Sequence, residues 1–327
     1  MEQAILGIDI SKSSFDVSLL FNGSCKWNAF ENNPEGYQRL DNWLKKYSLE
    51  PIYCCMEATG QYADCVAEYL HGSGHKVSVV NPARIKFYGN SKLKRNKTDK
   101  ADAELIAEYC LRENPSLWSP PPASFKDLQA LIRQLDALME SRQRYKNRLK
   151  SGVRTLRVIH SLENCVEFFT QEINQIKSEI QDLINNDPEL LRRQKLLITI
   201  KGIGKLTAAK LLGEIRDIRS FRSARQLAAY AGLTPKNFLS GSSVHKKTVI
   251  SKTGNAHLRK LLFLSAISAK QWNPIVKEFC DRLIQNGLSN MEAVCAAMRK
   301  LLHLVYGVLK SGKPFDPDYL KNTQIAS

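Results

Sequence analysis

The sequence predicts an α/β domain followed by a mostly helical region. Two observations carry this prediction across the 327 residues. Ahead of residue 115, short apolar runs with the composition of strands alternate with amphipathic helical patterns, as in a mixed sheet flanked by helices. Beyond a proline-rich stretch at 114–124, apolar residues recur at helical spacing in nearly every segment. A chain of this length can give each region a hydrophobic core of its own.

The charge of the chain predicts a polyanionic partner. Its formal net charge is +16, and many of the basic residues lie in two blocks that contain no acid. Residues 84–97 hold six of them and residues 142–157 hold seven. Solvated cationic faces also occur in proteins without such a partner, but two dense blocks in one chain favour nucleic acid.

Other classes of protein are disfavoured by what the sequence lacks. No apolar run reaches the ~18 residues that a membrane span needs, and the apolar segment 4–8 is too short for a secretory signal. The eight cysteines are scattered without a CxxC pair, which argues against a structural zinc site and a disulfide framework. We therefore expect no membrane association and a cytoplasmic protein with reduced thiols.

The first region has strand and helix patterns in an informative order. Asn22-Gly23 joins two strand-like runs and is a strong hairpin signal. Strands are expected at 4–10, 14–21, 25–30, 52–57 and 76–81, with a helix at 34–47. An antiparallel hairpin that feeds a mixed sheet flanked by helices is the ribonuclease-H-like arrangement, and we expect that fold here.

Four carboxylates are expected at one edge of this sheet. Asp9 and Glu57 each lie near the end of a buried strand, where reactive groups of open sheets gather. Asp99 and Asp102 follow Thr98, a good helix N-cap, and their i, i+3 spacing points both from the first turn toward one spot. Together the four suit divalent cations facing a phosphodiester. For the helical pair, the alternative is an acidic first turn that complements the helix dipole.

The proline-rich stretch separates the two regions. We expect a first domain at 1–115 and a linker at 116–124. Two runs of apolar heptad spacing follow, with a break expected near 159–161. They predict an antiparallel coiled-coil hairpin over 125–187, or alternatively a dimer seam, ahead of a mostly helical domain at 188–327.

Basic residues and one glycine turn mark candidate contacts with nucleic acid. The Lys and Arg residues between 142 and 157 cover the tip of the first long helix. They could bind nucleic acid or, alternatively, only face solvent. Residues 196–212 match a helix-hairpin-helix, whose Gly202-Ile-Gly204 turn would approach a phosphate, with an ordinary helical hairpin as the alternative. The candidate contacts are Lys92, Lys94, Arg95, Lys97, Arg142, Arg148, Gly202, Gly204, Lys205, Lys246 and Lys247.

A serine cluster follows in the segment 233–247. By residue type, Ser240-Gly-Ser-Ser243 is expected to be a flexible loop. No carboxylate–histidine pair lies nearby to make a hydrolase triad, and His245 is the only local candidate base. The cationic side chains expected to hold a scissile phosphate there are Lys246, Lys247, Lys252, Arg259 and Lys260. Helices are expected at 220–231, 254–270, 274–286 and 290–309.

Eight short motifs occur in order along the chain. They are Gly7-Ile-Asp9, Met56-Glu-Ala-Thr-Gly60, Asn81-Pro82, Arg95-Asn-Lys-Thr-Asp-Lys-Ala-Asp102, Gly202-Ile-Gly204, Ala231-Gly-Leu-Thr-Pro235, Ser240-Gly-Ser-Ser243 and Tyr306-Gly-Val-Leu-Lys310. In this order and spacing the chain resembles the DEDD transposases of the IS110 and IS1111 insertion sequences, described as bridge-RNA-guided serine recombinases. The resemblance covers nearly the whole chain.

The resemblance implies roles for particular residues. The family has a RuvC-like domain with a metal-binding tetrad, which falls on Asp9, Glu57, Asp99 and Asp102. The tetrad would hold Mg²⁺, two ions per site, or Mn²⁺ in its place. The serine of the transposase domain attacks DNA and leaves a 5′-phosphoserine link; by motif it falls on Ser240, with Ser242 and Ser243 as neighbours that residue type alone does not exclude.

The resemblance also implies partners. These are target and donor DNA, a noncoding RNA that the same element encodes and that pairs with both DNAs, and further copies of the chain in a dimer or tetramer. It places the protein at the nucleoid of a bacterium or archaeon. Two alternatives stay open. A metal-dependent nuclease or junction resolvase would cleave without a covalent adduct, and a non-enzymatic nucleic-acid-binding protein would be indifferent to Mg²⁺.

Overall fold

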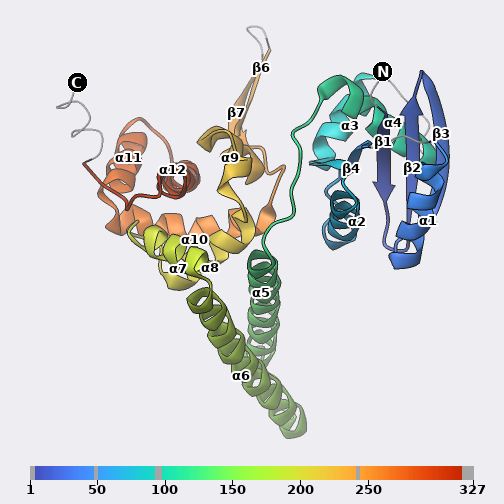
Figure 1. Ribbon diagram of the computed structural model, residues 1–327. Helices are drawn as coiled ribbons and strands as arrows, with labels where there is room; N and C mark the ends of the chain where they lie inside the picture. The colour runs from blue at the N-terminus through green and yellow to red at the C-terminus, as the bar shows by residue number, and fades with distance from the viewer. Residues whose placement is uncertain (1–3, 48–50, 93–97, 241–243, 319–327) are drawn as a thin grey trace. The chain divides into compact units, whose positions relative to one another are not determined.

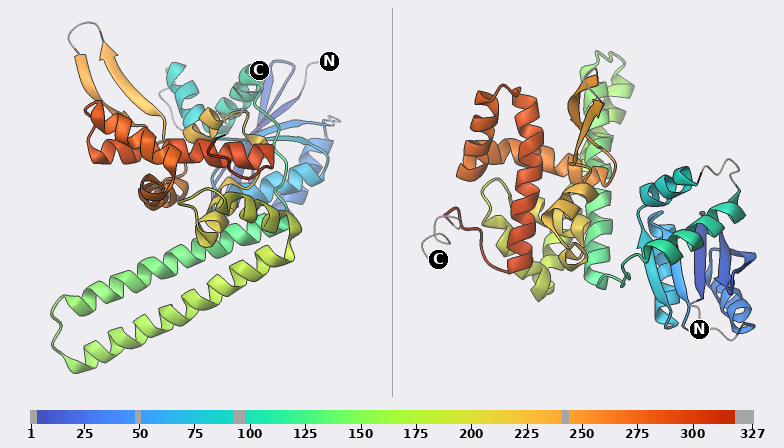
Figure 2. Two further views of the ribbon diagram at one scale, coloured as in Figure 1. Left: turned by 90° about the vertical axis from the view of Figure 1, so that its left-hand side faces the viewer. Right: turned by 90° about the horizontal axis from the view of Figure 1, so that it is seen from above.

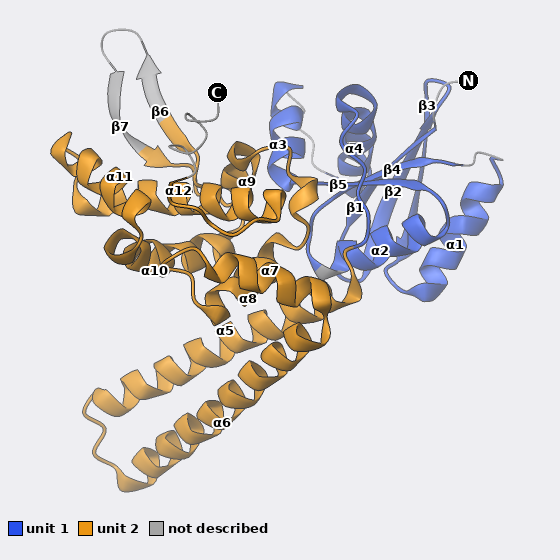
Figure 3. Ribbon diagram, turned by 60° about the vertical axis from the view of Figure 1, so that its left-hand side comes forward, with its two compact units in different colours: residues 1–120 blue, residues 121–327 orange. Residues whose placement is uncertain are grey.

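The chain folds into two compact units. The computed structural model describes residues 4–47, 51–92, 98–240 and 244–318. Unit 1 comprises residues 1–120 and unit 2 residues 121–327, so the division falls within the proline-rich stretch (Figure 3). Within the described part of the chain, no helix has the length and apolar character needed to cross a membrane.

Unit 1 is built on a five-stranded mixed sheet with the order β3-β2-β1-β4-β5 (Figure 1). β2 pairs antiparallel with β1 and with β3, whereas β1, β4 and β5 run parallel to one another. The strands are β1 (Ile5–Ile10), β2 (Ser14–Phe21), β3 (Ser24–Glu31), β4 (Tyr53–Glu57) and β5 (Lys76–Val80). The predicted hairpin feeding a mixed sheet is therefore confirmed.

The turn between β2 and β3 fixes the register of that hairpin. Asn22 and Gly23 have φ values of 49° and 71°. A two-residue turn with both residues in the left-handed region matches the twist of the strands on either side. The resulting register pairs Ser18 with Trp27 and Asp16 with Ala29, so Trp27 lies diagonally across from Asp16.

Side chains alternate between the two faces of the sheet, and both faces are buried. One face, with Leu6, Ile8 and Val17, packs against α1 (Pro34–Lys45) and α2 (Gln61–Gly72). The other face, with Ile5, Tyr53 and Cys55, packs against α3 (Pro82–Ser91) and α4 (Asp99–Glu113). Asp9 lies on this second face because it is two residues beyond Gly7 and four beyond Ile5.

Unit 2 consists of a long helical hairpin and a helical body (Figure 2). One hydrophobic cluster extends from Phe125 through Ile173 and Leu211 to Leu309, so the hairpin base shares its core with the helices that follow. The elements are α5 (Ala123–Lys150), α6 (Leu156–Asn186), α7 (Pro188–Ile198), α8 (Lys205–Ile215), η1 (Ile218–Ser220), α9 (Ala224–Tyr230), β6 (Pro235–Ser240), β7 (Val244–Ile250), α10 (Ala256–Trp272), α11 (Pro274–Gln285) and α12 (Asn290–Ser311).

The helical hairpin turns earlier than the sequence predicted. We expected a break near 159–161, but α5 ends at Lys150 and α6 begins at Leu156. Gly152 has a φ of 84°, which a glycine adopts at little cost, and it lies where the chain leaves α5. Leu156, the first residue of α6, has the spacing of the first heptad run, but its side chain is 72% exposed and does not belong to a buried seam. Coiled-coil packing and a separate hairpin domain remain predictions.

A β-hairpin that was not predicted flanks the serine cluster, and residues 241–243 of the expected loop lie outside the described part of the chain. β6 and β7 pair antiparallel, with Ser240 opposite Val244, and project from the helices of unit 2 (Figure 1). The signal was present in Val244, Thr248, Val249 and Ile250, because β-branched residues favour strands. The neighbouring serines and glycine concealed it.

Candidate active site

Gly7 allows helix α4 to lie directly against strand β1. A Cβ atom at Gly7 would lie 2.2 Å from the carbonyl oxygen of Ala103 and 2.4 Å from the amide nitrogen of Ala107. Both atoms belong to the backbone of α4, so no side chain fits there. The predicted cap at the start of α4 is confirmed, because Thr98 Oγ1 accepts a hydrogen bond from the Ala101 amide at 3.2 Å.

This packing brings carboxylates to one end of the sheet. Asp99 and Asp102 lie in the first turn of α4, which passes over β1 near Asp9. The register of β1 with β4 pairs Ile8 with Met56, so Asp9 and Glu57 occupy the next positions on neighbouring parallel strands. Asp9, Glu57 and Asp102 are half-buried and Asp99 is exposed.

Asp9 is affected both by burial and by neighbouring negative charges. Burial raises the pKa of Asp9, and the negative charges of Asp102, Asp99 and Asp16 raise it further, against a weaker opposing hydrogen bond from the Ile10 amide. These carboxylates repel one another in the protein alone. A bound cation would relieve that repulsion.

The donor chemistry fits a hard divalent cation, because carboxylate oxygens are the ligands that Mg²⁺ prefers. Within the described ranges, however, no three Asp, Glu, His or Cys side chains are gathered closely enough to hold a metal ion together. The carboxylates thus share one sheet edge without converging on a single point.

Asp16 is a further carboxylate at this edge that was not predicted from the sequence. It pairs directly with Asp9 in the register of β1 and β2. Its Oδ1 accepts a hydrogen bond from Nε1 of Trp27 at 3.1 Å. Burial raises the pKa of Asp16, the Trp27 bond lowers it, and the charge of Asp99 raises it again. The tight connection between residues 10 and 14 was the available signal, since it predicts which residues of the two strands lie opposite.

The basic candidates of unit 1 fall in two groups. Lys92 follows α3, where its Nζ lies 5.6 Å from the centre of the Tyr88 ring and 3.5 Å from Oε2 of Glu108. Its charge is therefore partly engaged within the unit. Lys94, Arg95 and Lys97 lie outside the described residues.

In unit 2, the two candidates of the long hairpin lie on α5. Arg148 is exposed, and its guanidinium carbon lies 5.9 Å from the centre of the Tyr145 ring, whereas Arg142 is half-buried. Both belong to the acid-free block of residues 142–157.

The glycine turn between α7 and α8 makes a packing contact that was not predicted. Gly202 has a φ of 102°, and a Cβ atom there would lie 2.7 Å from the Cα of Ala269 on α10. Its lack of a side chain therefore serves packing against α10, and its predicted contact with a phosphate remains a prediction. Gly204 and Lys205 fit the predicted role better, since both are exposed and α8 begins without a side-chain cap. The helix-hairpin-helix assignment remains a prediction.

Residues that follow the hairpin carrying Ser240 are closely packed or paired within unit 2. A Cβ atom on Gly254 would lie 2.3 Å from the carbonyl oxygen of Tyr230. Nη1 of Arg259 donates to the carbonyl of Ala231 at 3.0 Å. Lys260 pairs with Glu140 of α5. The last two were expected at a phosphate, but both have partners within unit 2.

Ser240 itself is the last residue of β6. The side chains of residues 237–248, including Lys246 and Lys247, lie outside the described part of the structure, as do Ser242 and Ser243 altogether. The backbone register thus places Ser240 at the distal end of the strand pair, and its role remains a prediction.

The chain is similar to known transposases and to a solved RuvC structure. A DEDD transposase model of the IS110 type matches residues 6–159, and a model described as "Transposase IS116/IS110/IS902 family" matches residues 194–281. Among solved structures, the RuvC of T. thermophilus in complex with a Holliday junction substrate is 13% identical, with a TM-score of 0.26, covering 35% of this chain and 96% of that chain. Because that score is low, we base the fold on strand order.

The sequence relatives extend over most of the chain. The "Pilin gene-inverting protein" of Moraxella bovis is 37% identical over 97% of this chain and 98% of its own length. The "Transposase for insertion sequence element IS1328" of Yersinia enterocolitica is 26% identical over 95% of this chain and 98% of its own. With two family models and a relative of this similarity, the chain belongs to the IS110 family of transposases.

Proposed function

We propose that this transposase cuts and rejoins DNA strands through a covalent protein–DNA intermediate. In the proposal, Asp9, Glu57, Asp99 and Asp102 form the phosphodiester site, and Ser240 is the nucleophile. The observation that carries it is that Asp9 shares one edge of the sheet with Asp99 and Asp102, whose charges raise its pKa, where Gly7 lets the first turn of α4 pack against β1. Perturbed acids of this kind concentrate at functional sites.

The carboxylates would hold the divalent ions of the site. The chemistry that Mg²⁺ supplies there, as two ions with Mn²⁺ as a substitute, is charge stabilisation at the scissile phosphate. Asp9 and Glu57 would act from the strands, and Asp99 and Asp102 from the helix.

The attack by serine exchanges one phosphoester bond for another and needs no further reactant. The Oγ atom of Ser240 forms a bond to phosphorus, and the bond from phosphorus to the 3′-oxygen of the DNA breaks. The serine loses its proton and the departing 3′-oxygen gains one. The 5′-phosphoserine link conserves the energy of the broken bond, so a second DNA end can be joined by the reverse attack.

The partners in the proposal are donor and target DNA, a noncoding RNA from the same element, and further copies of the chain. The net charge of +16 supports polyanionic partners. The relative from Moraxella bovis is named for inverting a gene. Inversion requires strands to be cut and rejoined, and this favours a recombinase over the alternative, a nuclease or resolvase that uses water.

The first test is to trap the covalent intermediate. Full-length protein is incubated with Mg²⁺, its co-purified RNA and DNA labelled on the 5′-phosphate side of the cut, and label that resists denaturing electrophoresis is measured. We expect Ser240→Ala to abolish the adduct, while Ser242→Ala, the matched control, retains it. An adduct that persists in Ser240→Ala would refute the assignment, and cleavage without any adduct would favour the nuclease.

The RNA partner has a separate test. Protein purified from cells that carry its native locus is stripped of nucleic acid, and the RNA is sequenced. One dominant structured RNA encoded beside the gene is expected. Heterogeneous cellular RNA would contradict the guided mechanism.

A further inference from the structure

An unusually exposed aromatic ring lies on helix α3. Phe87 is 67% exposed, whereas Ile85 on the opposite side of the same helix is 3% exposed. A Cβ atom on Gly89 would lie 2.9 Å from the Cδ2 of Leu105, so that inner side is held tightly against α4. Among the described residues, no aromatic ring or cation stacks on Phe87. The helix therefore packs well on one side and presents an unpartnered ring on the other.

The same outer side is basic. Arg84 lies one turn before Phe87, and Asn90 one turn after it, so the three share a side of the helix. Lys86 is adjacent, and Arg84, Lys86 and Asn90 are all exposed. Neither Arg84 nor Lys86 forms an ion pair with any other described residue, and the sequence holds no acid from 76 to 98.

The position of α3 ties this surface to the carboxylate edge. Asn81 caps the helix, its Oδ1 accepting a hydrogen bond from the Ala83 amide at 2.9 Å. The helix therefore starts directly after Val80 of β5, which pairs in register with Glu57 of β4. The first turn of α3 and the last residue of β4 share one end of the sheet.

We propose that Phe87 is a stacking platform for an unpaired base of a nucleic-acid strand, with Arg84 and Lys86 binding the adjoining phosphates. An aromatic face stacks on any base, and neighbouring cations neutralise the backbone, which is the chemistry of single-strand binding. Of the proposed function, this inference uses the nucleic-acid partner but neither the serine nor the metal. A second copy of the chain fits the surface poorly, because it would bring another +16 of charge to a basic patch.

Equilibrium binding without metal tests the proposal apart from catalysis. Full-length protein, stripped of RNA, is titrated in EDTA into a labelled single-stranded 12-mer and into a duplex of the same sequence, with anisotropy as the readout. We expect Phe87→Ala to weaken single-strand binding roughly tenfold, within the range measured for one stacked base. Phe87→Trp is expected to retain binding, and duplex affinity to change less than about twofold.

Two controls separate stacking from other effects. Leu111→Ala removes a residue of unit 1 that is 57% exposed and is expected to leave single-strand binding unchanged. An abasic 12-mer is expected to bind wild type and Phe87→Ala equally, because no base remains to stack. Equal single-strand affinity of wild type and Phe87→Ala would overturn the proposal. So would equal losses on single strand and duplex, or a change only in self-association by sedimentation. The serine adduct can form or fail independently of each result.

Discussion

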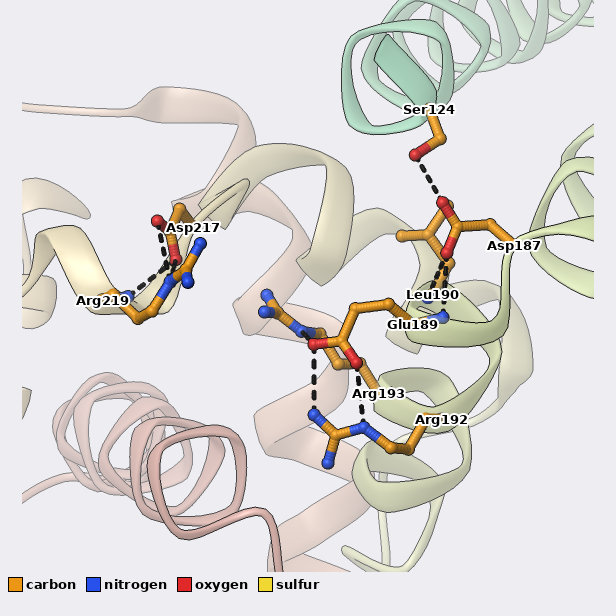
Figure 4. A network of polar contacts seen from close by, with 8 residues as sticks. All are labelled: Ser124, Asp187, Glu189, Leu190, Arg192, Arg193, Asp217 and Arg219. Atoms are coloured by element: carbon orange, nitrogen blue, oxygen red, sulfur yellow. Dashed lines mark hydrogen bonds and ion pairs between the residues drawn. The ribbon is translucent and has the colours of Figure 1, made fainter. Parts of the chain in front are cut away.

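Two groups of carboxylates, one in each unit, have opposite electrostatic surroundings. In unit 1, the pKa values of Asp9 and Asp16 are raised by burial and by neighbouring carboxylates. In unit 2, at the junction of α6 with α7, the pKa values of Asp187 and Glu189 are lowered by their partners (Figure 4). Asp9 and Asp16 are thus repelled by neighbouring carboxylates, whereas Asp187 and Glu189 are stabilised in their charged form by hydrogen-bond donors and arginines.

The compensation in unit 2 is visible in its contacts. Arg192 donates to Glu189 from Nε at 2.9 Å, and Arg193 donates from Nε at 2.7 Å. The Arg192 hydrogen bond is the main cause that lowers the pKa of Glu189 to about 2. Burial opposes the ionisation of Asp187, but the hydrogen bond from Ser124 and those from the Leu190 and Glu189 amides outweigh it.

This difference teaches which acids stabilise the fold and which are available to a ligand. A paired carboxylate with a lowered pKa adds to the free energy of unfolding at neutral pH. Clustered carboxylates with raised pKa values subtract from it until a cation binds. The edge of the unit 1 sheet therefore carries a stability cost that a purely structural role would not explain.

The largest expected effect comes from replacing an acid that we assign to ligand binding and not to stability. Asp102→Asn should lower DNA strand cleavage by more than about a hundredfold, since a metal site contributes several kcal/mol to the transition state. Because the substitution removes a repelling charge beside Asp9, the melting temperature of the metal-free protein should stay the same or rise. Glu113→Gln, an exposed acid at the other end of α4, is the control. Loss of both cleavage and stability in Asp102→Asn would contradict a functional role.

The next effect concerns the packing that gathers the carboxylates. Gly7→Ala should lower the free energy of unfolding by about 1–3 kcal/mol, the usual cost of overpacking, because its methyl group meets the α4 backbone. Cleavage should fall with it as α4 is displaced. Gly72→Ala in α2, where a Cβ meets nothing within 4 Å, should be neutral or slightly stabilising. Denaturant unfolding of both variants provides the comparison, and a Gly7→Ala protein as stable as wild type would contradict the packing described for α4.

Local patterns predicted much of unit 1 and less of unit 2. The Asn22-Gly23 turn and the apolar runs around Asp9 are short-range signals, so the strand order followed from them. Asp16 was missed because its proximity to Asp9 depends on strand register. The packing of Gly202 against Ala269 could not be predicted because the two residues lie far apart along the chain. The apolar heptad spacing continues in the sequence beyond Lys150, where α5 ends. The break was therefore predicted too late, because spacing alone does not show which apolar residues are buried.

The smallest effect is a difference in pH dependence between the units. The folded pKa of Glu189 is about 2, against an ordinary value of 4.5. Its stabilisation is thus present above pH 4.5 and is lost as the pH falls toward 2. For Asp9, whose folded pKa is raised above 3.8, the folded state binds the proton more tightly. The destabilisation from its charge is complete above the folded pKa and disappears as the pH falls toward 3.8.

Acidification should therefore lower the stability of unit 2. In unit 1 of the metal-free protein it should reduce the repulsion between carboxylates. Glu189→Gln should lower the free energy of unfolding by about 0.3–1 kcal/mol at pH 7, since the pair is partly exposed and screened. Asp9→Asn should raise it. Hydrogen exchange read by mass spectrometry, unit by unit, at pH 7 and pH 4 provides the measurement. In Glu189→Gln, the loss of protection in unit 2 on acidification should shrink. If Asp9→Asn instead weakened unit 1 at pH 7, the carboxylate edge would be a structural network like the one around Glu189, and the contrast between the units would fail.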